Sequence, residues 1–159
     1  MPSEASQTIK DRLYSDVMEK ENPSTRSNEL SEAQQRCTEL REVLLQVHKA
    51  LVDSERVSYE STMGPISSPG HFLQLLTRDP WFAWLQPLSQ LIVAIDEALD
   101  SKEPLTSASV DSLEKQANVL LVATENGEGF SKHFYDALQR DPDVVLAQSK
   151  MARLRKPSK

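Results

Sequence analysis

One long apolar stripe constrains the fold of this chain more than any other feature. Between Ser27 and Tyr59, apolar side chains recur every three or four positions without a miss, and Val43, Ala50 and Val57 widen the stripe. This spacing puts the side chains on one face of an α-helix. The sequence therefore predicts a long amphipathic helix. Its buried face consists of Leu30, Ala33, Cys37, Leu40, Leu44, Val47 and Leu51.

The width of the stripe favours packing inside a helical bundle. It is wider than a strict coiled-coil seam and too short for a free-standing rod, although it would also suit a dimer interface. Four glycines and no convincing alternating segment favour helix over strand, and 159 residues suffice for one domain. We therefore expect a single-domain, all-α bundle with four principal helices.

Two decapeptides, residues 71–80 and 133–142, resemble each other. They share His, Phe, Leu, Arg, Asp and Pro in the same order and spacing. Each is typical of a short amphipathic helix that ends at Arg-Asp-Pro, where Asp can cap the next helix and Pro can take its first position. The chain is therefore predicted to contain an internal repeat, with two of the principal helices bent at Arg-Asp-Pro corners. A chance match is the alternative.

The pattern divides the chain into three parts. Residues 1–26 are polar, but Ile9, Leu13 and Val17 recur at a spacing of four, which permits a short helix on the main body. Disorder is the alternative for this segment. Residues 27–154 form the predicted bundle domain, and 155–159 form a basic tail.

Inside the bundle domain, glycine and proline predict where the helices end. Residues 61–70 are expected to form a loop, because they contain two glycines and two prolines. Pro87 falls inside an apolar periodic segment, so a break is expected near residues 83–86. The hydroxyl groups at 106–109 are expected to cap a further helix. The predicted helices after the loop cover residues 71–78, 80–99, 106–121, 130–139 and 142–154.

Composition argues against several classes of function. The net charge of −6 disfavours nucleic-acid binding, although residues 140–159 carry six basic and two acidic side chains. The longest apolar run, residues 91–95, is far shorter than the ~20 residues of a membrane helix, and no signal peptide is evident. The lone Cys37 cannot form an internal disulfide and is expected to be a buried thiol. A soluble, cytoplasmic protein is therefore expected.

No motif predicts catalysis, a metal site or a cofactor. His71 and His133 begin the two repeated helices and would meet only if the repeats packed about a pseudo-twofold axis; surface hydrogen bonding is the stronger expectation. Carboxylate pairs such as Asp96 with Glu97 resemble the polar edge of a helix end. We therefore predict no catalytic residue, no metal ligand and no cofactor.

Aromatic residues provide the remaining candidates. Trp81, Phe82 and Trp84 point in different directions around one helix, so at least one ring is expected to be exposed, to line a cavity or to meet a partner. The favoured function is protein–protein interaction, with a protein partner or a second copy of the chain. The alternative is a small-ligand or metal-binding bundle with a pocket near Trp81, Trp84 and Pro87. The candidate ligand or interface residues are Phe72, His71, Trp81, Phe82, Trp84, His133, Arg78 and Arg140.

Overall fold

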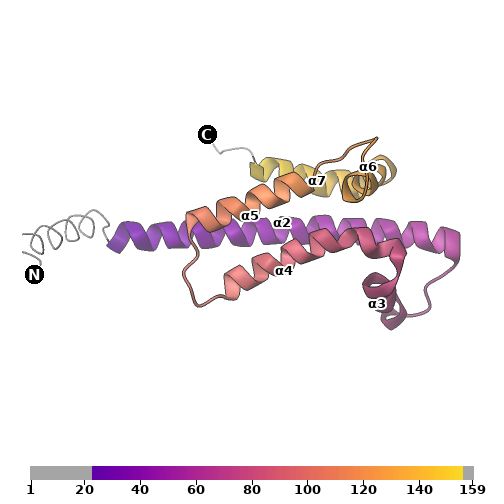
Figure 1. Ribbon diagram of the computed structural model, residues 1–159, viewed down its shortest axis with the longest axis horizontal. Helices are drawn as coiled ribbons and strands as arrows, with labels where there is room; N and C mark the ends of the chain where they lie inside the picture. The colour runs from indigo at the N-terminus through magenta and orange to yellow at the C-terminus, as the bar shows by residue number, and fades with distance from the viewer. Residues whose placement is uncertain (1–22, 156–159) are drawn as a thin grey trace, which may run out of the picture.

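The computed structural model describes residues 23–155, and its secondary structure in this range consists of helices joined by loops (Figure 1). It contains six α-helices and one 3-10 helix, with no strand in that range. The all-α prediction is confirmed. The predicted short helix through Ile9, Leu13 and Val17 lies outside the described residues, as does most of the basic tail.

The long helix α2 (Pro23–Met63) is the axis of the fold. Helices α4, α5 and α7 pack along it, with α3 and α4 on one side of α2 and α5, α6 and α7 on the other in Figure 1. The predicted stripe is confirmed as the centre of the core, because five of its side chains are completely buried. These five are Cys37, Leu40, Leu44, Val47 and Leu51.

The predicted loop at 61–70 is too long at both ends. Helix α2 continues to Met63, and within its last turn the Ser61 and Thr62 hydroxyl groups donate hydrogen bonds to the Ser58 carbonyl. Gly64 then ends the helix with a φ of 101°, a conformation that glycine adopts without strain.

Helix α3 (Pro69–Arg78) begins two residues earlier than the sequence indicates. Ser68 is its N-cap, and the Ser68 Oγ accepts a hydrogen bond from the His71 backbone N–H at 3.0 Å. Pro69 suits the first turn because it has no N–H to satisfy. The connection between α2 and α3 therefore consists of residues 64–68 only.

The helix expected over residues 80–99 is broken, as predicted from Pro87. Its first part is the 3-10 helix η1 (Pro80–Leu85), and its second is α4 (Gln86–Asp100). Pro87 lies in the first turn of α4, where a missing N–H and a fixed φ cost little. The 3-10 helix η1 thus connects α3 to α4.

The rest of the chain forms three helices close to the predicted positions: α5 (Ser107–Leu120), α6 (Phe130–Arg140) and α7 (Pro142–Arg155). The Thr106 Oγ1 caps α5 by accepting a hydrogen bond from the Ser109 N–H at 3.1 Å, as the hydroxyl cluster predicts.

The two Asp-Pro segments have the same local hydrogen bonding. The Asp79 Oδ1 accepts from the Trp81 N–H at 2.8 Å, and the Asp141 Oδ1 accepts from the Asp143 N–H at 2.9 Å. Each Asp also ends the preceding helix, because its backbone is extended while its own N–H donates the last helical hydrogen bond at 2.9 Å. The internal repeat itself stays a prediction. Among the described residues, no helix combines the length and apolar character needed to cross a membrane.

Candidate functional site

The most buried charged side chain of the described residues is a carboxylate on α2. Glu55 is only 6% exposed, and its two oxygens have different donors. Oε2 accepts from the Trp81 indole Nε1 at 2.9 Å, and Oε1 accepts from the Arg140 Nη2 at 3.2 Å. Trp81 belongs to the first Asp-Pro segment and Arg140 to the second. Glu55 thus joins α2, η1 and α6 at one end of the bundle.

The two arginines of the Arg-Asp-Pro segments have different environments. Arg140 also donates from Nε and Nη2 to the buried Ser54 Oγ, at 3.1 and 2.9 Å. Arg78 is exposed and forms no ion pair with any residue between 23 and 155. The shared motif therefore places only Arg140 in the Glu55 network.

Three of the candidate aromatic rings form one cluster around Tyr59. Phe82 is buried, and the Tyr59 ring lies 5.5 Å from both the Phe82 and Trp81 rings, measured between centroids. Phe72 contacts Phe82 edge-on at 6.0 Å, and the Arg56 guanidinium lies 4.8 Å from the Phe72 centroid. These rings bind α3 and η1 to α2, which is a core role.

Trp84 belongs to a second cluster, formed with α6. Its side chain is buried, at 9% exposure, and the exposed His133 ring stacks on it at 5.0 Å with an interplanar angle of 14°. Phe130 covers the indole at 5.3 Å. The Trp84 Nε1 has no acceptor among the described residues. Phe82 and Trp84 are therefore both buried in the isolated chain.

The histidines have separate partners. The His71 Nδ1 lies 3.2 Å from the Ser67 Oγ, whereas His133 stacks on Trp84. Their helices, α3 and α6, lie on opposite sides of α2 in Figure 1. His48 is part-buried, with its Nε2 2.9 Å from the Ser89 Oγ, and burial lowers its pKa below the usual 6.5. Between residues 23 and 155, no group of three or more His, Cys, Asp or Glu side chains is arranged to hold a metal ion.

Carboxylates on the polar faces of the helices, Asp96 among them, have local partners. Asp96 pairs with Arg41 between α4 and α2, and the Glu39 Oε1 accepts a hydrogen bond from the Gln35 amide on the same helix at 3.4 Å. On the other side of α2, Arg36 pairs with Glu114 of α5 at 3.0 Å. These contacts join the helices through their polar edges.

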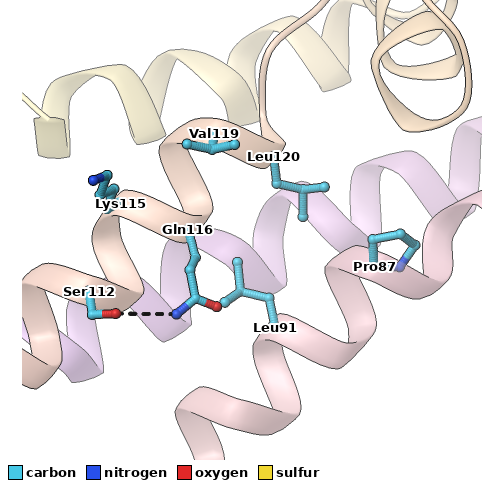
Figure 2. Close-up of a pocket in the computed structure, with 7 residues that line it drawn as sticks. All are labelled: Pro87, Leu91, Ser112, Lys115, Gln116, Val119 and Leu120. Carbon is cyan, nitrogen blue, oxygen red and sulfur yellow. Dashed lines mark hydrogen bonds between the residues drawn. The ribbon is translucent and has the colours of Figure 1, made fainter.

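A groove of about 440 Å³ lies between α4 and α5 and is open to a ligand or partner. Figure 2 shows Pro87 and Leu91 on α4 facing Gln116 and Leu120 on α5. The groove floor is largely apolar, and Val119 beside it is 69% exposed.

The polar groups of the groove all come from α5. The Gln116 Nε2 donates to the Ser112 Oγ at 3.4 Å (Figure 2). Lys115 is exposed and forms no ion pair with a residue in the described range. The groove therefore offers an apolar floor with one cationic edge, which suits an apolar segment carrying a carboxylate.

The sequence located only part of this site. Pro87 was a predicted pocket residue and lines the groove, whereas Trp81 and Trp84 do not. The groove residues of α5 were not predicted, because their polar and apolar side chains resemble an ordinary solvated face. The one available signal was Val119, an apolar residue outside the buried face of its helix.

Comparison of the chain with protein-family models, with curated proteins and with solved structures finds no match. The functional argument therefore rests on the geometry.

Proposed function

We propose that this chain is a non-catalytic helical-bundle protein that acts through protein–protein interaction and self-associates through the α4–α5 groove. The observation that carries the proposal is the side chain of Val119, which is 69% exposed and lies next to the half-buried Leu120 at a groove of about 440 Å³. Burial of such surface by a second copy would stabilise the complex by about 25 cal/mol per Å² before the costs of association.

The groove is a better candidate for an interface than the aromatic clusters, because the side chains of those clusters make their contacts within the chain. Phe82, Trp84 and Glu55 are used within the chain, where they fix η1 and α6 to α2. The net charge of −6 supports a protein partner over nucleic acid. A cytoplasmic location and an internal repeat belong to the same proposal. So do four principal helices (α2, α4, α5 and α7), two of which are bent at the Arg-Asp-Pro corners.

The test compares two exposed valines in the full chain. Val119→Asp puts a charge beside the groove, whereas Val93→Asp puts the same charge on α4 outside it, at a residue that is 53% exposed. Sedimentation equilibrium at micromolar to millimolar concentrations measures the dimer constant. We expect at least tenfold weaker association for Val119→Asp and an unchanged constant for Val93→Asp. Equal constants for both variants, or a wild-type chain that is monomeric throughout, would refute the proposal.

A small-ligand function is the second candidate, because the groove volume falls within the ~300–1,000 Å³ of typical ligand pockets. Its few polar groups, Ser112, Lys115 and Gln116, would orient an apolar molecule with an acidic group. Native mass spectrometry of the purified chain tests this candidate. A defined extra mass that Val119→Asp removes would favour it, and a bare chain would count against it.

A further inference from the structure

The connection between α5 and α6 contains a reactive pair of residues, Asn126 and Gly127. Residues 124–127 form a turn in which the Gly127 N–H donates to the Thr124 carbonyl at 3.2 Å. Glycine is favoured at the last position of such a turn. The Asn126 side chain is exposed, and Figure 1 shows the connection extending away from α2. The turn therefore places an accessible asparagine amide immediately before a residue that has no side chain.

An asparagine in this setting reacts with its own backbone. The Gly127 nitrogen attacks the Asn126 Cγ and closes a five-membered succinimide ring. The side-chain amino group leaves and takes up the proton that the Gly127 nitrogen loses, so one molecule of ammonia is released. Water then adds to one of the two ring carbonyls and opens the ring to aspartate or isoaspartate. The reaction needs water and no other reactant.

The other asparagines of the chain are less suited to ring closure. Asn28 lies in α2 and Asn118 in α5, so the N–H that follows each of them is held in a helical hydrogen bond. In both cases the next residue also carries a side chain that crowds the attacking nitrogen. Asn22 precedes Pro23, whose nitrogen has no hydrogen to lose. Asn126 is therefore the asparagine at which a succinimide forms most readily.

Gly127 is packed closely in the turn, so the product changes the local structure. A Cβ at Gly127 would lie 2.5 Å from the Ser131 Oγ and 3.0 Å from the Thr124 Cβ. Isoaspartate routes the main chain through the former side chain and lengthens it by one C–C bond, about 1.5 Å. Since Gly127 has no free space on this side, the added length moves Thr124 or Ser131.

These two residues hold the start of α6. The Thr124 N–H donates to the Ser131 carbonyl at 3.1 Å, and the Ser131 Oγ donates to the Glu128 carbonyl at 3.2 Å. Both hydrogen bonds tie the connection to the first turn of α6, from which the His133 ring stacks on Trp84 of η1. Movement at the turn is therefore transmitted to the contact between α6 and η1.

The charge of the product acts in the same direction. A carboxylate replaces the neutral amide at position 126, between the exposed carboxylates of Glu125 and Glu128. Like charges this close repel each other, and more strongly at low salt. The modified turn is therefore less stable than the original one for two independent reasons.

We propose that Asn126 is a site of spontaneous succinimide formation, and that its isoaspartate product releases the start of α6 from η1. The rate in the folded chain depends on opening of the turn, because the Gly127 nitrogen must first give up its hydrogen bond to Thr124. Because the ammonia diffuses away, the change runs in one direction. Isoaspartate at this turn therefore accumulates with the age of each molecule, and so does the loosening of α6.

Peptide mapping of the aged full chain tests the site. The protein is incubated at neutral pH and digested, and chromatography with tandem mass spectrometry separates the amide, aspartate and isoaspartate forms of each peptide. We expect conversion at Asn126 at least tenfold faster than at Asn28 or Asn118. Asn126→Gln is the control, because its longer side chain would have to close a six-membered ring, and it should stay unchanged over the same period. Conversion at Asn126 no faster than at the two helical asparagines would overturn the assignment.

Hydrogen exchange of the same aged sample tests the release of α6. The α6 amides of the isoaspartate molecules should exchange at least tenfold faster than those of the unaged chain, whereas the α4 amides should not change. The fast-exchanging fraction should equal the isoaspartate fraction in the peptide map. Equal exchange of α6 in aged and unaged protein would overturn the release, even where Asn126 has been converted.

Asn126→Asp separates the two effects of the product. This variant adds the same charge without lengthening the main chain, so its α6 amides should exchange severalfold more slowly than those of the isoaspartate molecules. Exchange as fast as in the isoaspartate molecules would overturn the lengthened main chain as the cause of the release.

Discussion

The Glu55 network makes a quantitative prediction about stability. The carboxylate is 6% exposed and receives the Trp81 indole N–H at 2.9 Å. A hydrogen bond to a charged group contributes ~1.5–3 kcal/mol, and more when its loss leaves a buried group unpaired. The Arg140 side chain is 38% exposed, so solvent screening limits its ion pair with Glu55 to ~1 kcal/mol or less. Trp81 is therefore the more important of the two partners.

We expect Trp81→Phe to lower the free energy of unfolding by about 2–3 kcal/mol, from the lost hydrogen bond and a smaller ring. Glu55→Ala removes the hydrogen-bond acceptor. In that background, Trp81→Phe should lower the free energy of unfolding only through the smaller area of the buried ring. The coupling energy of this double-mutant cycle should be ~1–2 kcal/mol. Urea unfolding followed by far-ultraviolet circular dichroism measures all four proteins. A coupling energy near zero would refute the argument that Trp81 holds the buried carboxylate.

Three further predictions concern single residues. Burial lowers the pKa of His48 below 6.5, so the unfolded chain binds its proton first. The stability that neutral His48 contributes is complete above about pH 6.5 and falls as the pH drops through the folded-state pKa. In His48→Gln, the urea midpoint of unfolding should therefore vary less with pH between about pH 7.5 and 5.5 than in the wild type. Burial raises the pKa of the Cys37 thiol, so it should react with a disulfide reagent only as fast as the chain opens, with a rate that rises in urea. Thr106→Ala should cost about 1 kcal/mol in urea unfolding while Thr106→Asp largely keeps the cap; equal losses would contradict the capping role.

Local signals in the sequence predicted most of the helix boundaries. The Thr106 cap and the break before Pro87 follow from side-chain and backbone chemistry within a few residues, and both are present. The same kind of signal was misread at 61–70. Gly64 ends α2 and Ser68 begins α3, so the glycine and the serine before proline were better markers than the cluster of loop-forming residues.

Long-range contacts explain what the sequence could not indicate. Glu55 resembles any carboxylate on a helix, and its partners Trp81 and Arg140 lie 26 and 85 positions away. Arg78 and Arg140 occupy the same place in a shared motif, yet only one reaches the network. Likewise, the groove exists because α4 and α5 contact each other as well as α2, which no pattern within either helix specifies.

The position of α2 has a consequence for the order of folding. It is the first helix of the described range, and α7, the last, packs along it. A growing chain therefore presents the apolar stripe of α2 long before α7 exists to cover its share of that stripe. At ~5–20 residues per second, the ~80 residues between the two helices take several seconds to synthesise. During that interval the part of the α2 stripe that α7 covers stays exposed, and it is buried only when α7 packs along α2.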